Sequence, residues 1–376
     1  MQAECMNRRR FISVTGASIL AAGGTFYLFS DKNNFTRSDI KEPPSGKISF
    51  HPDEKEILYL ASLAPSGHNA QPWFVKYIEP YHWIIGNDKT KWLPAVDPTQ
   101  RETILSIGAF MQNLEYAALH YGYRCDWNIL ASSNQDENIA EVRLYKQNNN
   151  SAFDTSKIVN RRTVRSIYLK DALKKDDVAY LTGNEQNNIY YFANSSKECQ
   201  WLSEQTIEAN RIQMNRDDAE KELANWIRFS SEDAKKYCDG LTTASMEMNG
   251  MTGWVVRNFY NREDVMKKSF RDKGVEKVKE QVTHSAGWIL ISGKDNSVSS
   301  LLEIGKRMQG LFLKVRERAI ALHPMTQLLE ESLGSKKVNE ITGIDDNIHF
   351  ILRTGYIKNY PDPVSLRRPV DWFIRK

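Results

Sequence analysis

The sequence contains little cysteine, which argues against a fold held together by disulfide bonds. Its 376 residues include four cysteines, and no two of them form a C-x-x-C pair. If the N-terminal segment that contains Cys5 is removed, three remain, an odd number that does not suit a disulfide framework even in an exported protein. We interpret Cys125, which lies close to two aromatic residues, as a small core residue rather than a redox centre.

Charge of one sign is also scarce. The formal net charge is +4 over the whole chain, too little to indicate nucleic acid as a partner, which usually requires a concentrated basic face. The hydrophobic share of 41% and the charged share of 26% are those of an ordinary folded protein. The length permits one large domain or two fused ones.

Several well-known catalytic and ligand-binding motifs are missing. The sequence has no H-E-x-x-H motif, no cluster of Cys and His and no EF-hand loop, so it predicts no metal site. No G-x-G-x-x-G follows an expected strand, so a Rossmann domain for a nicotinamide cofactor is not predicted. Spacing alone does not exclude a Ser-His-Asp hydrolase, but the G-x-S-x-G elbow of such enzymes is absent.

Residues 1–30 have the composition of an export signal. Arg8 and Arg9 are followed by Phe11 and by a moderately apolar run over 14–29. The arginine pair with an aromatic residue two positions later resembles the signal read by the twin-arginine translocase. A membrane anchor with a basic flank is the alternative, although glycine and hydroxyl residues interrupt the apolar run. We expect a periplasmic protein, or one on the outer face of the cytoplasmic membrane. Whether the signal is cleaved or kept as an anchor stays open.

The rest of the chain divides into a linker and two parts of similar organisation. Residues 31–50 are polar, contain a Pro-Pro pair and show little periodicity, so they are interpreted as a linker. In the first part, 51–150, periodicity predicts a helix from Asp53, strands over 74–78 and 82–86, a long helix over 99–122 and a strand over 140–146.

The second part, 151–376, repeats the order of a long helix followed by a strand. It contains a charged helical region over 198–236 and a Met- and Gly-rich segment over 239–256. A buried strand over 286–292, a helix over 301–322 and a last strand over 349–357 follow. The pattern predicts an α+β fold. Two related halves packed side by side would explain the repeated order, but many α+β proteins alternate in this way.

A loop between the first helix and the first strand carries the first candidate site. It contains Pro65, Ser66, Gly67, Asn69 and Gln71, and Pro72 is expected to hold Gln71 in an extended conformation. A hydroxyl, amides and backbone N–H groups in a restrained loop suit the polar edge of a flat heterocycle. A plain helix-to-strand connection, with the amides satisfying backbone groups, is the alternative.

Two arginine motifs carry the second candidate site. Arg161, Arg162, Thr163 and Arg165 offer three guanidinium groups and a hydroxyl within one turn, and Arg367 begins an Arg-Arg-Pro motif near the C-terminus. Arginine donates bidentate hydrogen bonds to phosphate oxygens, so a phosphate site is plausible. Short arginine runs are also common on solvated surfaces, and that interpretation stays open for both motifs.

Together the three motifs resemble the FMN-contacting motifs of the nitroreductase superfamily. Ordinary members have the arginine motif before the Pro-Ser-x-x-Asn motif, whereas here the loop precedes the arginines by some ninety residues. This order, the export signal and the Trp-Leu-Pro-Ala-Val-Asp-Pro run over 92–98 are similar to those of the Acg subfamily. Members of that subfamily look like two nitroreductase halves fused into an intrachain pseudo-dimer, and the resemblance extends from about His51 to the C-terminus.

The resemblance implies one FMN per chain, bound between the halves. Residues 45–60 contain no equivalent of the arginine motif and residues 190–230 none of the loop, so one complete site remains. It implies that Arg162 packs near the ring system and that His68 faces either the substrate cavity or solvent. It places the phosphate and ribityl chain against Arg161, Thr163, Arg165 and Arg367, and the isoalloxazine against Pro65, Ser66, Gly67, Asn69 and Gln71.

The function implied is that of an oxidoreductase in which FMN passes hydride or electrons to a small acceptor such as a nitroaromatic or a quinone. NAD(P)H is the conventional donor for such enzymes. A second hypothesis is an exported protein that holds flavin with little turnover, with residues 239–256 as a lid, because methionine packs adaptably on aromatic surfaces. That segment is equally consistent with a packed helix hairpin. A structural module without flavin is the third hypothesis.

Overall fold

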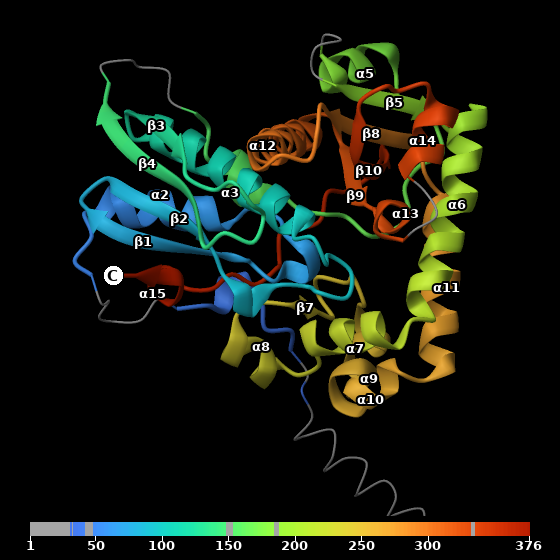
Figure 1. Cartoon of the computed structure of the whole chain (residues 1–376). Coiled ribbons are helices and arrows are strands. Elements are labelled where there is room, and N and C mark those ends of the chain that lie inside the picture. The colour runs from blue at the N-terminus through green and yellow to red at the C-terminus, as the bar shows by residue number, and fades with distance from the viewer. Residues whose placement is uncertain (1–30, 32, 42–47, 148–152, 184–187, 332–334) are drawn as a thin grey trace, which may run out of the picture.

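The computed structural model describes residues 31, 33–41, 48–147, 153–183, 188–331 and 335–376. The expected export signal, residues 1–30, lies outside the described residues. The structure contains two main sheets with helices on their faces, and the predicted α+β class is confirmed (Figure 1). A third, minor sheet pairs β6 (Ile227–Arg228) with β7 (Leu241–Thr242) in parallel.

The first half contributes four strands to a five-stranded sheet in the order β11-β1-β2-β4-β3. The fifth strand, β11 (Ile374–Arg375), comes from the end of the chain. The hairpin of β1 (Trp73–Glu79) and β2 (His82–Asn87) turns at Tyr81, whose φ of 62° permits the tight reversal. The helices α2 (Pro52–Ser62) and α3 (Arg101–His120) pack in one hydrophobic core with the sheet. The other two strands of this half are β3 (Tyr123–Ile129) and β4 (Asn138–Lys146).

The second half forms a four-stranded antiparallel sheet in the order β5-β8-β10-β9. Its central strand β8 (Gly287–Gly293) is buried along its whole length, because helices cover both faces. Side chains of β8 alternate in the manner of a strand: Ile289 and Ile291 pack in the core that contains α12, and Trp288 and Leu290 in the core that contains α6. The elements are α6 (Lys197–Met214), α12 (Val298–Val315), β5 (Ile189–Ala193), β9 (Ile320–Pro324) and β10 (Asn347–Tyr356).

The remaining helices lie around these two sheets, and α11 runs beside α6 on the outer side of the second sheet (Figure 1). They are α4 (Ser156–Asn160), α5 (Lys175–Thr182), α7 (Asp217–Trp226), α8 (Ser231–Tyr237), α9 (Gly250–Phe259), α10 (Arg262–Val265), α11 (Lys268–Thr283), α13 (Gln327–Glu330), α14 (Ser335–Thr342) and α15 (Val370–Phe373). The short 3-10 helices are η1 (Arg37–Asp39), η2 (Gly67–Asn69), η3 (Lys89–Lys91) and η5 (Arg316–Arg318).

The two halves meet where α3 and α12 cross at the centre of the molecule (Figure 1). Each helix contributes a glycine at the crossing. A Cβ on Gly108 would lie 2.2 Å from the carbonyl oxygen of Leu302, and one on Gly305 would lie 2.1 Å from that of Leu105. This reciprocal close approach requires glycine at both positions.

The end of the chain returns from the second half to the first. Strand β11 (Ile374–Arg375) pairs in parallel with β1, with Val75 opposite Ile374. The residues before it, from Leu366 to Pro369, are extended and buried. The C-terminal arm, which we define as residues 366–376, therefore belongs to the first sheet in space although it follows the second half in sequence.

Several predicted boundaries are wrong in detail. The helix expected over 301–322 ends at Val315, since Ala319 takes a left-handed φ of 52° and the chain then enters β9. The helical region over 198–236 is three helices, α6, α7 and α8. Strand β3 was not predicted. The strand over 349–357 was expected to be the last one, but β11 follows it.

The described part of residues 31–50 is attached to the body of the protein. The Asp31 carboxylate accepts hydrogen bonds from the backbone N–H and hydroxyl of Ser231, at 2.6 and 2.9 Å. Asn34 accepts one from the Thr243 hydroxyl at 2.9 Å. Further along, the backbone N–H of Arg37 donates to the carbonyl of Val364, just before the C-terminal arm, at 3.3 Å. This stretch thus contacts parts of the chain about 200 residues or more away.

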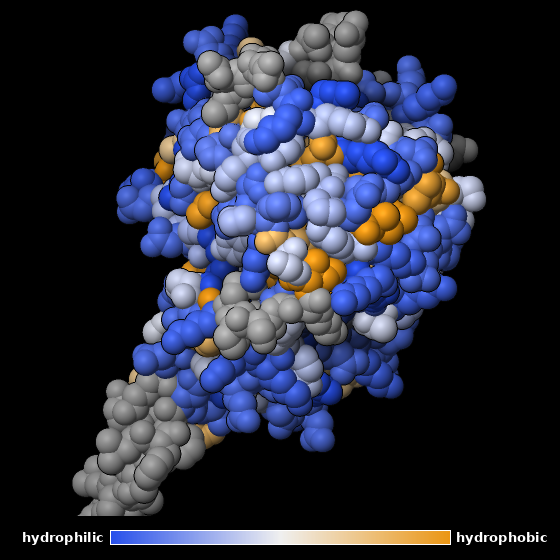
Figure 2. Space-filling model, turned by 90° about the vertical axis from the view of Figure 1, so that its left-hand side faces the viewer, coloured by the Kyte–Doolittle hydropathy of each residue, from blue (hydrophilic) through white to orange (hydrophobic). Residues whose placement is uncertain are grey.

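The outer surface shows no large apolar face in the view of Figure 2, where apolar residues lie in small separate groups among hydrophilic ones. Among the described residues, no helix combines the length and the apolar character needed to cross a membrane. Cys125, Cys199 and Cys238 are unpaired thiols. Within the same residues, no three His, Cys, Asp or Glu side chains are arranged to hold a metal ion.

Candidate functional site

A cavity of about 250 Å³ lies between the two halves. From the first half it is lined by Pro65, Ser66, Gly67 and His68, the beginning of the predicted loop. From the second half it is lined by Thr163 and Arg165 of the predicted arginine motif. Val96, Leu241, Met308 and Phe350 contribute apolar wall. Residues that are nearly a hundred positions apart in sequence therefore face one shared, partly open cavity.

The loop itself is held in an unusual backbone conformation. His68, Asn69 and Gln71 have positive φ angles of 48°, 54° and 55°. The extended conformation expected for Gln71 is therefore wrong. The hydrogen bonds of Gln71 explain the difference: its backbone N–H donates to the Ser66 hydroxyl at 2.9 Å, and its side chain donates to the carbonyl of Cys238 at 3.0 Å.

The two amide side chains of the loop fasten it to other segments. Asn69 donates to the carbonyls of Gly240 and Leu366, both at 3.1 Å, and accepts from Arg367 at 2.7 Å. Gln71 accepts from the backbone N–H of Arg368 at 2.9 Å. Neither amide lines the cavity. Both side chains are buried and support the loop from behind, which leaves Pro65 to His68 at the cavity wall.

Two predicted arginines reach the same end of helix α2 from different parts of the chain. Arg161 and Arg367 each donate to the carbonyl of Leu63 at 3.1 Å. Arg367 also donates to the carbonyl of Ala64 at 2.9 Å. Since Arg367 also bonds Asn69, the arginine motif, the C-terminal arm and the loop form one contiguous group.

The other two arginines of the motif contact the Met- and Gly-rich segment. Arg162 forms an ion pair with Glu247 at 3.1 Å, and Glu247 also accepts the backbone N–H of Arg165 at 3.1 Å. The Arg165 guanidinium donates to the carbonyl of Ser245 at 2.9 Å. Arg162 is therefore occupied with residues 244–247 and does not line the cavity, whereas Arg165 does.

Positive charge is concentrated at Arg37, Arg161 and Arg367, none of which is among the lining residues of this cavity. Burial lowers the pKa of Arg161 to about 10, with the charges of Arg37 and Arg165 contributing. Burial also lowers the pKa of Arg367 well below its ordinary value, and Arg161 and Arg37 add to the effect. Among the described residues, none of Arg37, Arg161 and Arg367 forms an ion pair with a carboxylate. The Nε atoms of Arg161 and Arg367 are buried and have no partner there. Such a group of cations favours the binding of an anion.

The cavity wall also carries half-buried acidic groups that the sequence analysis did not identify, Glu102 and Glu330. The Thr326 hydroxyl lies 3.1 Å from a Glu102 oxygen and 2.7 Å from a Glu330 oxygen, and Gln213 donates to the other Glu330 oxygen at 2.6 Å. Burial and the nearby charge of Glu102 raise the pKa of Glu330. Burial lowers the pKa of His68, which also lines the cavity, to about 4, and the charge of Arg165 contributes.

The raised pKa of Glu330 predicts a dependence of stability on pH. A carboxyl whose pKa is higher in the folded than in the unfolded state contributes stability below its unfolded pKa of about 4.3, and this is lost as pH rises toward the folded value. Glu330→Gln is therefore expected to lose less stability than the wild type between pH 5 and pH 8. Urea unfolding of both proteins at the two pH values measures this. Equal losses in both proteins would contradict the raised pKa.

Some residues of the site have no signal in the sequence. Arg37 lies in a stretch without periodicity, Glu247 in a segment noted for methionine and glycine, and Glu330 in no motif. Their partners are tens to hundreds of positions away. Their roles depend on which residues meet in the folded chain, and a single sequence does not contain that information.

The chain is similar to known proteins over most of its length. No protein-family model matches it. PigM of Serratia sp., described as a candidate NAD(P)H nitroreductase, is 23% identical over 312 residues, which cover 76% of this chain and 82% of PigM. Acg of Mycobacterium tuberculosis, with the same description, is 23% identical over 336 residues, which cover 84% of this chain and 93% of Acg.

A solved structure of a candidate nitroreductase from Anabaena variabilis aligns with 85% of this chain and 93% of its own, at 12% identity and a TM-score of 0.33. A TM-score this low adds no argument. The sequence likeness to PigM and Acg supports a relationship to the nitroreductase superfamily and an oxidoreductase activity.

Proposed function

We propose that the chain is an FMN-dependent oxidoreductase of the nitroreductase type, with one flavin between its halves. It would take hydride from NAD(P)H and deliver it to a small acceptor such as a nitroaromatic or a quinone. The observation that carries the proposal is the shared cavity, in which Pro65 to His68 of the first half face Thr163 and Arg165 of the second.

The residues present fit a phosphate-bearing flavin. The buried cations Arg161 and Arg367 have unpartnered Nε–H donors and no carboxylate partner among the described residues, as an anion site requires. Apolar residues such as Met308 and Phe350 suit a flat aromatic ring. The volume of about 250 Å³ is just below the lower end of the roughly 300–1,000 Å³ common for ligand sites.

FMN, when bound, supplies the reversible uptake and release of hydride. The chain supplies binding and position: Arg161, Thr163, Arg165 and Arg367 would hold the phosphate and ribityl chain, and Pro65, Ser66 and Gly67 would border the ring. Asn69 and Gln71 would act indirectly by fixing the loop. No side chain is assigned as an acid or base for the transfer.

A second function, storage of flavin without turnover, is favoured by one observation. Leu241 of the segment 239–256 lines the cavity, and Glu247 of the same segment holds Arg162 and Arg165. The methionines do not supply the contact: Met246 packs in a separate apolar cluster, and Met251 is 73% exposed. The side chain of Leu241 would then be the part of this segment that restricts access to the flavin ring.

One experiment decides between these functions. The purified full chain is examined by absorption spectroscopy, the released flavin is identified and counted per chain, and NADH or NADPH is added without oxygen. Loss of the yellow band supports the oxidoreductase. Persistent colour under excess reductant supports storage, and a colourless chain that binds no added FMN rejects both.

We also propose export by the twin-arginine pathway, because that pathway moves folded proteins and FMN is loaded in the cytoplasm. The motif at Arg8 and Arg9 supports this. Replacing both with lysine should retain the protein in the cytoplasmic fraction, and unchanged export would reject the proposal.

A further inference from the structure

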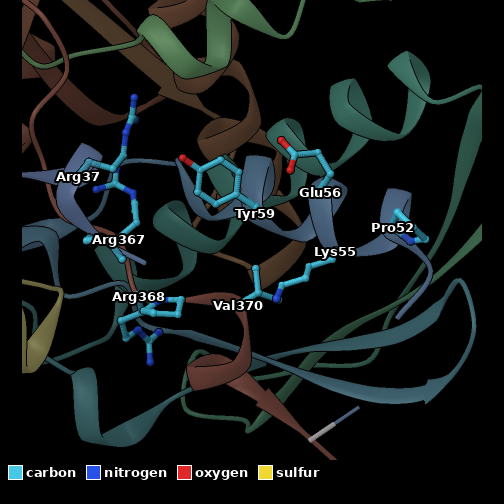
Figure 3. A pocket seen from close by; sticks show the side chains of 10 residues that line it. Arg37, Pro52, Lys55, Glu56, Tyr59, Arg367, Arg368 and Val370 are labelled. Carbon is cyan, nitrogen blue, oxygen red and sulfur yellow. The ribbon is translucent and has the colours of Figure 1, made fainter. Parts of the chain in front are cut away.

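A second cavity, of about 510 Å³, lies between α2, the C-terminal arm and the segment around η1 (Figure 3). The Arg-Arg-Pro motif over 367–369 lines it, together with residues that belong to no motif. Arg37, Tyr59, Arg367 and Arg368 are among its lining residues. In Figure 3 the side chains of Arg37, Arg367 and Tyr59 lie near one another on one side of this cavity.

Arg37 is held in place by both halves of the chain. Its backbone N–H bonds the carbonyl of Val364, and its guanidinium donates to the carbonyl of Val159 at 2.8 Å. Val159 immediately precedes the arginine motif, and Val364 precedes the C-terminal arm. Arg37 therefore lies against both segments that carry Arg161 and Arg367.

These three guanidinium groups influence one another electrostatically. Arg37 and Arg367 line the same cavity, and Arg367 and Arg161 share the carbonyl of Leu63, so the three cations lie close together. In agreement, the charge of Arg37 contributes to lowering the pKa of both Arg161 and Arg367. Burial is the main cause of the lowered pKa of Arg37 itself. Their hydrogen bonds reach only neutral oxygens, namely the carbonyls of residues 63, 64, 159 and 366 and the amide of Asn69. One carboxylate, that of Glu56, also lines the cavity, so the three cations still leave a net positive charge there.

The positive charge indicates which kind of anion would fit the cluster. A phosphomonoester carries about −1.5 to −2 charges near pH 7 and three acceptor oxygens, so it matches several guanidinium groups at once. A carboxylate carries one charge and two oxygens, and would leave more of the cluster unbalanced.

We infer that Arg37 completes a three-guanidinium site with Arg161 and Arg367 for a phosphomonoester, and that ligand binding there fastens residues 33–41 to the body. The inference rests on the proposed function only for the identity of the ligand, which is either the phosphate of FMN or that of a separate phosphorylated molecule. The segment that joins the expected export signal to the fold thereby becomes part of a binding site.

The test compares the full-length chain with Arg37→Gln. Arg211→Gln is the matched control, because Arg211 is exposed and, among the described residues, its ion pair is with Glu208 alone. FMN, riboflavin and inorganic phosphate are the probes. Binding is followed by flavin fluorescence, and ordering of residues 33–41 by hydrogen–deuterium exchange. Loss of a charged hydrogen-bonding group should weaken binding about 10- to 100-fold.

If FMN supplies the phosphate, Arg37→Gln weakens FMN binding by that factor and leaves riboflavin binding unchanged. If a separate ligand supplies it, FMN binding is unchanged, but inorganic phosphate slows exchange of residues 33–41 in the wild type and not in Arg37→Gln. The inference is overturned if the two proteins behave alike with all three probes, or if FMN and riboflavin binding weaken equally. A wild type that binds no flavin would reject the proposed function, while the phosphate measurement would still test this site.

Discussion

Gly305→Ala is expected to destabilise the protein by about 3 kcal/mol, because overpacking of a close contact typically costs about 1–3 kcal/mol and sometimes more. The new Cβ would lie 2.1 Å from the backbone oxygen of Leu105, which cannot move without shifting α3. Alanine has a higher helix propensity than glycine by about 1 kcal/mol, so helix propensity alone would make Gly305→Ala more stable than the wild type. The steric clash costs more than the gain in helix propensity, so we expect a net loss of stability.

Gly310 provides a matched control in the same helix. No atom lies within 4 Å of the Cβ that Gly310→Ala would add, so this variant should be more stable by about 0.5–1 kcal/mol. Urea unfolding midpoints of the two variants measure the difference. If Gly305→Ala is also more stable than the wild type, α3 and α12 do not cross as closely as described. Because the crossing sets the spacing of the halves, Gly305→Ala should also bind flavin more weakly.

Asp239→Asn is the second substitution with a large expected effect. The Asp239 carboxylate is fully buried and pairs with the buried Arg228 and with Lys91, whose Nζ lies 2.6 Å from it. Removing one partner of a buried ion pair leaves an uncompensated charge and costs about 3–5 kcal/mol. We expect a loss of that size in urea unfolding.

The matched control for this substitution is Asp272→Asn. Asp272 pairs with Lys268 on the surface, where both side chains are mostly exposed, and such pairs contribute about 0–1 kcal/mol. The Asp239 variant also tests the site, since the carbonyls on either side of Asp239, those of Cys238 and Gly240, hold Gln71 and Asn69. Flavin binding should therefore weaken in Asp239→Asn and not in Asp272→Asn. Equal stability of the two variants would contradict the role of the buried pair.

The sequence predicted those parts of the fold that have a local cause. The helix at α3 follows from its helical periodicity and the strand β8 from a continuous apolar run. Pro80 marked the turn between β1 and β2, and Gly122 marked the end of α3. The helix at α12 was predicted too long because Ala319, four residues after Val315, continues the apolar spacing of a helix. The left-handed Ala319, which starts a strand instead, has no local signature.

The candidate site was predictable where a motif carried it. The motifs marked the loop and the arginines, and the structure places parts of both around one cavity. Their detailed roles depend on distant partners. Asn69 and Gln71 face residues 238–240 and the C-terminal arm, Arg162 pairs with Glu247, and Arg37 joins the cations from outside any motif. A single sequence does not show which distant oxygen atom will accept the hydrogen bond of a given donor.

The position of the C-terminal arm has a consequence for synthesis. The edge of β1 receives its partner β11 only from residues 374–375, and Arg367 reaches the loop from the same arm. A ribosome finishes these residues last. Every earlier stage of translation therefore presents an unfinished sheet edge and an incomplete set of cations, and a product truncated before residue 366 lacks both.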